Sequence, residues 1–346
     1  MLKVDLDLGY PGFELSAALA AGEGEFWGLV GPSGSGKSTL LSAIAGLVRP
    51  RRGEVVLGDQ VFFRHRERER AVWLTLPRRR VGYLTQENDL FPHLNVRQNL
   101  TYGTGTTAHL DELVSLLELD GLLDRRPAHL SGGQKSRVAL GRILAGQPRL
   151  LLLDEPFAAL DWHLRRRLGE FLLRLQGRYG FTVIMATHDL EELPRLCSHV
   201  AVLGEGRVLQ AGDVSGVLEA PAGAAAAAAL GYHLLPVEVP ETGLIKIGPT
   251  LLTHPSATET GRAVLAFHPA CLRSLPCAED VPGLAITGKV TRRVEYGGTA
   301  YCRVALPGGG EVLLEKVPEA PPDGAEVVVG LTQFSLFPFW WEYAET

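Results

Sequence analysis

The sequence has no hydrophobic run long enough to cross a bilayer, because no segment reaches about 18 consecutive uncharged apolar residues. Its first ten residues, MLKVDLDLGY, lack the apolar core and the small-residue cleavage site of a signal peptide. An excess of positive charge is also missing, since 34 Lys and Arg stand against 39 Asp and Glu. We therefore expect no membrane-spanning helix, no signal peptide and no nucleic-acid partner bound through overall charge.

Cysteine is scarce and histidine is scattered. The four cysteines, Cys197, Cys271, Cys277 and Cys302, match no zinc-site spacing and are too few for a disulfide framework. The ten histidines form no HxxxH or HExxH pair. We expect free thiols, as in a reducing compartment, and no metal centre built from His and Cys side chains.

The pattern that is present in the first two thirds of the chain is typical of an α/β fold. Leu2, Val4, Leu6 and Leu8 alternate with polar residues, which predicts a strand. Continuous apolar runs, typical of parallel strands covered on both faces, lie at residues 25–30, 150–153 and 182–186. Helical patterns lie at residues 38–47, 110–119, 133–144 and 162–178. This alternation predicts a parallel sheet with helices on its faces.

The composition changes near residue 220. Residues 221–231 read PAGAAAAAALG, which predicts a short helix or a linker. Beyond it, short runs rich in Val and Leu are separated by Gly and Pro turn signals, a pattern typical of a small all-β domain such as a barrel. We therefore predict an α/β domain over residues 1–231 and an all-β domain over residues 232–346.

A phosphate-binding loop is predicted directly after the second strand. Residues 31–39, GPSGSGKST, fit the pattern GxxxxGK[ST] between an apolar strand and a helix. Glycines let the backbone N–H groups turn toward phosphate oxygens, Lys37 supplies a cation for the β- and γ-phosphates, and the Ser38 hydroxyl can ligate Mg²⁺. The predicted phosphate-binding residues are Gly31, Ser33, Gly34, Ser35, Gly36, Lys37, Ser38 and Thr39.

Two carboxylates follow the apolar run at residues 150–153. A buried strand that ends in Asp154 would carry this carboxylate to the sheet edge where the phosphates lie, and Asp154 would then hold Mg²⁺. Glu155 can polarise a water molecule for attack on the γ-phosphate.

Residues 130–134 read LSGGQ, and here the chain resembles the ATP-binding cassette (ABC) family. Gln86 matches the glutamine of the family's Q-loop, Asp161 its D-loop and His188 its switch histidine, and all motifs stand in the family's order. The resemblance covers about residues 1–220. It implies a P-loop α/β ABC ATPase, in which a RecA-like core carries an antiparallel β subdomain and a helical subdomain at about residues 87–145.

The resemblance also implies a cofactor, a dimer and roles for individual residues. Mg²⁺-bound ATP would lie between the glycine-rich loop of one subunit and the signature of a second copy in a head-to-tail homodimer. The signature residues that would contact nucleotide are Ser131, Gly132, Gly133 and Gln134. His188 would hold the attacking water, Gln86 would contact Mg²⁺ and water, and Asp161 would complete the site. Tyr10, with Phe13 in reserve, is the aromatic residue expected to stack on adenine.

The C-terminal region narrows the resemblance to importers. Residues 232–346 resemble the OB-like regulatory (TOBE) domain of importer ATPases for sugars, sulfate, iron, polyamines and molybdate. Residues 90–103, LFPHLNVRQNLTYG, resemble the segment after the Q-loop in molybdate, tungstate and some sulfate or iron importers, although FPHL occurs across the importer group. The resemblance favours an ATPase subunit for an inorganic ion such as molybdate. The alternatives are a sugar, polyamine, sulfate or iron(III) importer, or a soluble ABC ATPase that acts on nucleic acid or ribosomes.

An importer subunit of this kind implies partners and a location. Two integral-membrane permease subunits and a periplasmic or extracellular substrate-binding protein would complete the system. The chain itself would lie peripherally at the cytoplasmic face of the membrane. Arginine clusters at residues 64–70 and 78–80 are interspersed with glutamates, and we expect them to form a solvated loop with salt bridges rather than a nucleic-acid site.

Overall fold

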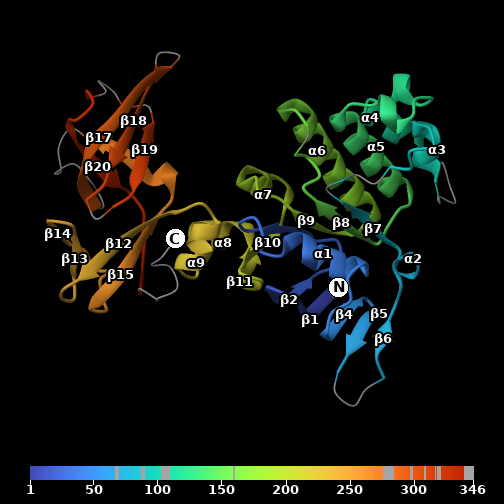
Figure 1. The fold of residues 1–346 in the computed structure, drawn as a ribbon, viewed down its shortest axis with the longest axis horizontal. Helices are drawn as coiled ribbons and strands as arrows, with labels where there is room; N and C mark the ends of the chain where they lie inside the picture. The colour runs from blue at the N-terminus through green and yellow to red at the C-terminus, as the bar shows by residue number, and fades with distance from the viewer. Residues whose placement is uncertain are drawn as a thin grey trace. The chain divides into compact units, whose positions relative to one another are not determined.

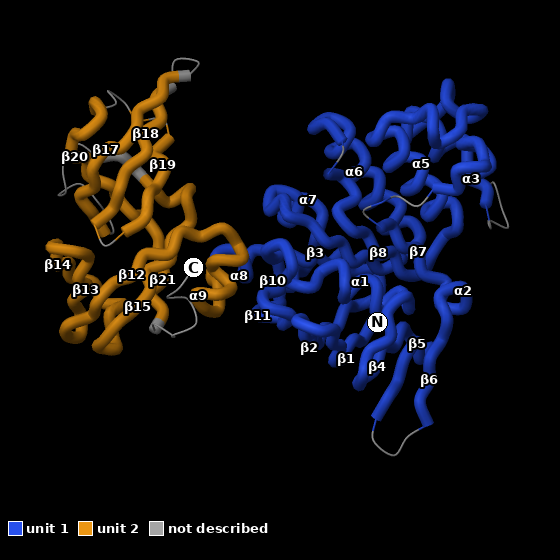
Figure 2. The backbone as a smooth tube through the Cα atoms, in the orientation of Figure 1, with its two compact units in different colours: residues 1–219 blue, residues 220–346 orange. Residues whose placement is uncertain are grey.

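The computed structural model divides the chain between Glu219 and Ala220 (Figure 2). The structure describes residues 1–66, 70–85, 87, 90–102, 110–158, 160–275, 284–296, 299–307, 309–315, 317 and 321–338. Composition placed the boundary after residue 231. The alanine-rich stretch forms helix α9 (Ala224–Ala229), which contacts β12 (His233–Val239) and β15 (Gly261–Phe267) and thus belongs to the second unit.

The first unit contains a mixed sheet of 11 strands (Figure 1). Its strands are β1 (Leu2–Tyr10), β2 (Phe13–Ala21), β3 (Phe26–Val30), β4 (Arg52–Leu57), β5 (Gln60–His65), β6 (Val72–Trp73), β7 (Val81–Leu84), β8 (Leu150–Asp154), β9 (Thr182–Ala186), β10 (His199–Gly204) and β11 (Arg207–Asp213). The order across the sheet is β6-β5-β4-β1-β2-β11-β10-β3-β9-β8-β7. The antiparallel wing of the sheet consists of strands β6, β5, β4, β1 and β2, each antiparallel to the next. The parallel centre consists of β3, β9, β8 and β7.

Helices connect and cover these strands. They are α1 (Lys37–Ala45), α2 (Leu76–Arg79), α3 (Val96–Thr101), α4 (Leu110–Leu116), α5 (Gly132–Ala145), α6 (Trp162–Tyr179), α7 (Leu193–Leu196) and α8 (Val214–Glu219), with 3₁₀ turns η1 (Asp120–Leu122), η2 (Pro127–His129) and η3 (Leu190–Glu192). Helices α3 and α4 each contact α5 in the region predicted to be helical, and α5 also contacts β7. No helix in the described part of the chain is both long and apolar enough to span a membrane.

The parallel centre of the sheet positions the site. Every residue of β3, β8 and β9 is buried, as their continuous apolar runs predict. Parallel strands bring their carboxyl ends to one edge of the sheet, and in open α/β sheets ligands bind beyond this edge. The loops after β3, β8 and β9 therefore meet where these three strands end.

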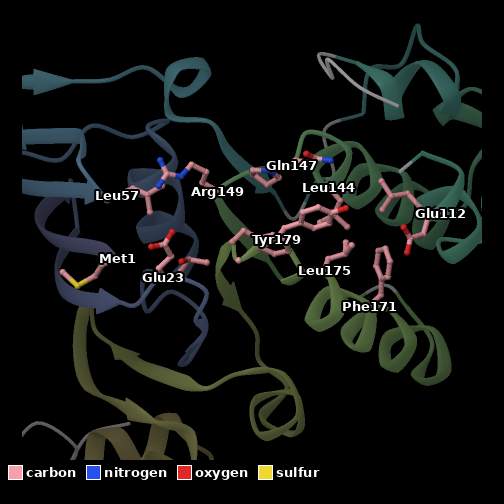
Figure 3. Close-up of a pocket in the computed structure, with 16 residues that line it drawn as sticks. Met1, Glu23, Leu57, Glu112, Leu144, Gln147, Arg149, Phe171, Leu175 and Tyr179 are labelled. Carbon is pink, nitrogen blue, oxygen red and sulfur yellow. The ribbon is translucent and has the colours of Figure 1, made fainter. Parts of the chain in front are cut away.

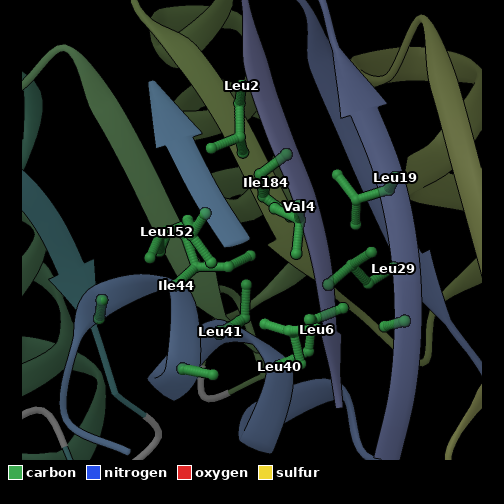
Figure 4. Packing of buried hydrophobic residues seen from close by; sticks show 14 of the residues in the cluster. Leu2, Val4, Leu6, Leu19, Leu29, Leu40, Leu41, Ile44, Leu152 and Ile184 are labelled. Atoms are coloured by element: carbon green, nitrogen blue, oxygen red, sulfur yellow. The ribbon is translucent and has the colours of Figure 1, made fainter. Parts of the chain in front are cut away.

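A continuous core joins the antiparallel wing to helix α1 (Figure 4). Leu2, Val4 and Leu6 of β1 point inward at every second residue, which confirms the predicted strand. Leu40 and Ile44 of α1 pack into the same cluster, together with buried residues of β8 and β9. Burial of each such side chain stabilises the fold by about 1.5–3 kcal/mol. The buried side chains of α1 therefore hold this helix, and the loop that precedes it, against the sheet.

The arginine-rich segments depart in one respect from the expected solvated loop. Arg64 and Arg66 pair with Glu54, whose carboxylate is buried. Arg79, however, is only 1% exposed. Its guanidinium donates to backbone carbonyls of α1 and of the antiparallel wing, because the last carbonyls of a helix lack intrahelical partners. The expectation of a solvated side chain is wrong for Arg79.

The second unit consists of antiparallel sheets, consistent with the predicted OB-like domain. Its further elements are β13 (Leu244–Ile247), β14 (Thr250–Thr253), η4 (Pro269–Cys271), β16 (Leu272–Leu275), β17 (Leu284–Tyr296), β18 (Thr299–Ala305), β19 (Glu311–Glu315), β20 (Glu326–Leu331) and β21 (Ser335–Pro338). One sheet has the order β14-β13-β12-β15-β21 and the other β16-β20-β17-β18-β19. Buried residues of both sheets form one core. Cys197, Cys271 and Cys302 are free thiols, as predicted, and Cys277 lies outside the described residues.

Candidate functional site

A glycine-rich loop leads from the buried strand β3 into helix α1. Gly31 and Gly36 have φ angles of 148° and 105°. A Cβ atom at Gly31 would lie 2.1 Å from the carbonyl oxygen of Leu203, so a side chain does not fit there. Gly36 begins α1 without a side-chain cap, which leaves the first amide groups of the helix without intrahelical acceptors. The loop therefore offers N–H groups and the positive end of a helix dipole to an anion.

Lys37 folds back over this loop. Its Nζ donates to the carbonyl oxygens of Gly31 at 2.7 Å and Pro32 at 2.9 Å. Burial lowers the pKa of Lys37, while the nearby carboxylates of Glu155 and Asp154 act in the opposite direction. The ammonium group is thus held at the loop and beside both acidic residues.

Asp154 ends strand β8 directly beside the start of α1. Its side chain is 5% exposed, and burial raises the pKa of this carboxyl group. A hydrogen bond from the Ser38 hydroxyl and the charge of Lys37 counteract that rise. The sequence-predicted residues Lys37, Ser38 and Asp154 therefore lie together, although about 115 residues separate them along the chain.

Glu155 and His188 form a pair at the same edge. Glu155 has a φ of 50°, an uncommon conformation for a residue with a side chain. Its backbone N–H donates to the carbonyl of Ala186 at 3.0 Å, which ties the turn after β8 to the end of β9. The Nδ1 atom of His188 lies 3.4 Å from Oε2 of Glu155. Backbone strain of this kind is concentrated at functional sites.

A buried polar network holds the turn that carries His188. The Thr187 hydroxyl donates to the Glu192 carboxylate at 2.7 Å and accepts the N–H of Asp189. Arg165 of α6 pairs with Asp189 at 2.6 Å and lies 3.7 Å from Glu192. Burial raises the pKa of Glu192. Sequence reasoning missed this network, and its only local signal is the hydroxyl beside His188 with acidic residues following it.

The LSGGQ segment forms the N-terminus of helix α5. The Ser131 hydroxyl accepts the N–H of Gln134 at 3.3 Å, and the Gln134 side chain accepts the N–H of Ser131 at 3.0 Å. This capping box satisfies amide groups that the helix leaves unpaired. A Cβ atom at Gly132 would meet no atom within 4 Å, so this turn is open. Within the described ranges, no hydrogen bond joins Ser131 or Gln134 to the glycine-rich loop.

The remaining predicted residues take different positions. The Asp161 side chain caps α6 by accepting the N–H of Leu164 at 3.0 Å, and this backbone hydrogen bond lowers its pKa. Tyr10 is 43% exposed at the end of β1. Phe13 lies against the loop, since a Cβ atom at Gly36 would be 3.0 Å from its ring. Gln86 lies outside the described residues.

No cluster of three or more His, Cys, Asp or Glu side chains that could ligate a metal is found among the described residues.

Comparisons with known proteins agree with the phosphate-binding geometry of this site. Residues 16–158 match the family described as ABC transporter. The molybdenum import ATP-binding protein ModC of Rhodospirillum rubrum is 40% identical over 227 residues, which covers 64% of this chain and 60% of that protein. The sulfate/thiosulfate import ATP-binding protein CysA of Mesorhizobium japonicum is 40% identical over 308 residues, which covers 83% of this chain and 86% of that protein. The match to CysA is therefore too long to be confined to the first unit.

Solved structures give the same picture for the first unit. A dimeric ATP-binding cassette in a post-hydrolysis state, bound to ADP and Pi, is similar with a TM-score of 0.52 and 28% identity. The similarity covers 62% of this chain and 99% of that one.

Proposed function

The chain belongs to the ABC transporter family, and we propose that it is the ATP-hydrolysing subunit of an import system. The observation that supports this most directly is the Glu155–His188 pair beside the glycine-rich loop. A carboxylate and an imidazole in contact can hold and deprotonate a water molecule. The loop next to them is built to hold the phosphates of a nucleotide.

Phosphate binding would use the loop and its neighbours. The N–H groups after Gly36 and the ammonium group of Lys37 would hold the β- and γ-phosphates. Ser38 and Asp154 fit Mg²⁺ because a hydroxyl and a buried carboxylate, both hard oxygen ligands, already meet there. Gln86 is a further candidate ligand. Bound Mg²⁺ would supply positive charge beside the phosphate oxygens.

Hydrolysis would then proceed at Glu155. The oxygen of a water molecule attacks the γ-phosphorus while a proton of that water passes to the Glu155 carboxylate. The bond between the γ-phosphorus and the β–γ bridging oxygen breaks, and its electron pair stays on ADP. His188 would fix the carboxylate and the water, and the Thr187 network would keep His188 in place. The aromatic ring of Tyr10 or Phe13 would stack on adenine.

A second copy of the chain would complete each site. Helix α5 begins at the signature residues Ser131, Gly132, Gly133 and Gln134, where Ser131 and Gln134 hydrogen-bond to each other. The N–H groups of Gly132 and Gly133 and the Ser131 hydroxyl would meet the γ-phosphate bound by a partner, with Asp161 at the same interface. The similarity to a dimeric cassette bound to ADP and Pi supports this arrangement.

We propose a tetrahedral oxyanion as cargo, with molybdate and sulfate as the two candidates. Relatives named for molybdenum import and for sulfate/thiosulfate import match at equal identity, and the sulfate/thiosulfate relative covers more of the chain. Two membrane permease subunits and a substrate-binding protein would select and carry this anion. The chain would lie at the cytoplasmic face of the membrane, bound to the permeases.

The variant Glu155→Gln tests the mechanism. Its amide can hold water but cannot accept the proton, so MgATP should remain bound and the variant should form a dimer on size-exclusion chromatography with light scattering. Glu205→Gln removes an equal charge from an exposed residue and should hydrolyse ATP as the unmodified chain does. A Glu155→Gln protein that stays monomeric with MgATP, or that hydrolyses ATP normally, would overturn the proposal.

A further inference from the structure

A pocket opens on the first unit, at the opposite ends of the strands that carry the candidate site (Figure 3). Arg149 and Thr182 line it, and these residues stand at the amino ends of β8 and β9. Asp154 and His188, by contrast, lie at or beyond the carboxyl ends of the same strands. The pocket is thus separate from the proposed nucleotide site.

The size and the walls of this pocket fit a small aromatic molecule. Its volume is about 220 Å³. A dry cavity of about 150 Å³ holds benzene, so this pocket can hold one or two fused rings. Leu144, Phe171, Leu175 and Phe181 contribute buried apolar walls. Figure 3 shows the first three of these on the side of the pocket formed by helices α5 and α6.

One charged group at the mouth of the pocket lacks a partner. The guanidinium of Arg149 makes no hydrogen bond and no ion pair within the described part of the chain. It lies beside the backbone of Gly58, since a Cβ atom there would be 3.6 Å from Nη2 of Arg149. A planar guanidinium with free N–H groups is suited to a carboxylate, which it can hold through two parallel hydrogen bonds. Glu23 and Glu112 also line the pocket, and their carboxylates disfavour a second negative charge on the ligand.

We infer that this pocket is a binding site for a small aromatic monocarboxylate. The ring lies between the apolar residues of α5 and α6, and the carboxylate lies against Arg149. The inference does not depend on ATP hydrolysis by this chain, because the pocket shares no residue with the nucleotide site.

The elements that form the pocket also lead to the candidate site. Helix α5 begins at the signature segment and ends at the pocket, and β8 and β9 run from the pocket to Asp154 and His188. A helix of this length spans about 20 Å at about 1.5 Å per residue. A ligand that moves α5 against the strands would therefore shift residues at both ends. If the proposed ATPase activity holds, occupancy should change the rate of hydrolysis.

Methionine labelling offers a direct test, because the chain has only 2 methionines. Met1 lines the pocket, whereas Met185 is buried within β9. We would titrate protein carrying ¹³C-methyl methionine with 2-naphthoate and, as an uncharged match, 2-naphthalenemethanol. A Met185→Leu variant assigns the two signals. The expected result is a saturable shift of the Met1 signal with 2-naphthoate that persists in the presence of MgATP.

Two variants and a control locate the ligand. Arg149→Gln should weaken 2-naphthoate binding about tenfold, as expected for loss of a charged hydrogen-bond partner, and leave 2-naphthalenemethanol within about twofold. Arg195→Gln removes an exposed arginine outside the pocket and should change neither affinity. Leu175→Trp fills the pocket and should abolish binding of both probes.

Several results would overturn the inference. The absence of a saturable Met1 shift with the unmodified chain would show that the pocket does not take this ligand class. Equal effects of Arg149→Gln on the affinities of both probes would show that Arg149 does not bind the carboxylate. Binding of 2-naphthoate that MgATP displaces, or that a folded Leu175→Trp protein retains, would place the ligand elsewhere. Because Arg149 is exposed, its substitution keeps the test valid even if Leu175→Trp fails to fold.

Discussion

Arg79 offers the clearest test of how the first unit is held together. Its Nε donates to the carbonyl of Leu74 at 2.7 Å, and its terminal nitrogens donate to Ile44 at 2.6 Å and to Ala43 and Phe62 at 3.2 Å each. Ala43 and Ile44 lie in the last turn of α1, so the guanidinium caps the helix that starts at the phosphate loop. The substitution Arg79→Met keeps an unbranched side chain and removes all donors.

The expected loss of stability follows from these contacts. A carbonyl left buried without a donor costs about 1–3 kcal/mol. The guanidinium also lies 4.8 Å from the centroid of the Trp73 ring, a contact worth about 0.5–2 kcal/mol. Burial already lowers the pKa of Arg79 to about 10, which shows that the charge itself is costly there and reduces the net loss. We expect Arg79→Met to lower the free energy of unfolding by about 3–5 kcal/mol.

Thermal unfolding of the full chain, followed by circular dichroism, measures this loss. For a unit of this size, about 1 kcal/mol corresponds to about 2–4 °C, so the midpoint of the first unit should fall by about 6–20 °C. Arg78→Met is the matched control, because Arg78 is the adjacent exposed arginine and should shift the midpoint by less than about 2 °C. An Arg79→Met protein as stable as Arg78→Met would refute the role assigned to the buried guanidinium.

Three other substitutions test the candidate site. Thr187→Val removes the hydroxyl that holds Glu192, so kcat for ATP should fall about tenfold with little change in KM, and Thr187→Ser should restore it. Asp154→Asn should abolish hydrolysis yet raise the thermal midpoint of the nucleotide-free protein at pH values where the Asp154 carboxyl group is ionised. Because the pKa of Asp154 is higher in the folded chain than its ordinary value of 3.8, ionisation of this group lowers the stability of the fold as the pH rises above 3.8. An asparagine cannot ionise, so the variant should not lose this stability. Thermal midpoints of both proteins measured from pH 4 to 8 would reveal the difference. Ser131→Ala removes a helix cap worth about 1 kcal/mol, and it should impair ATP-dependent dimerisation more than ATP binding, as measured by light scattering and by fluorescent-nucleotide titration.

The elements that determine the fold could be predicted because their signals are local. Alternating apolar residues from Leu2 to Leu8 predicted a strand that is buried on one face, as β1 is. The continuous apolar run that ends at Leu153 predicted a strand that is buried on both faces, as β8 is. The helical pattern at residues 162–178 ends one residue before the observed end of α6, and the structure shows Asp161 as the N-cap and Gly180 as the C-cap of this helix. The glycine-rich pattern before Lys37 and Ser38 likewise lies between a strand and a helix, as predicted.

Other features depend on partners that are distant along the chain. Arg79 looks like one member of an exposed cluster until α1 and the antiparallel wing close around it. Thr187, Glu192 and Arg165 become a network only when α6 packs beside the turn after β9. Arg149 is one arginine among many until α6 and the edge of the sheet leave a pocket beside it. A sequence pattern reports which residues are buried far better than it reports what they meet.

The conformation of Glu155 bears on how variants of this chain should be selected. Glycine adopts a φ of 50° without steric cost, whereas a residue with a Cβ atom costs about 1 kcal/mol there. A library screened only for heat resistance would therefore enrich glycine at position 155, together with uncharged residues at position 154. Each round of such a screen would discard the carboxylates proposed for chemistry, so selection for robustness in this protein has to be coupled to a measure of turnover.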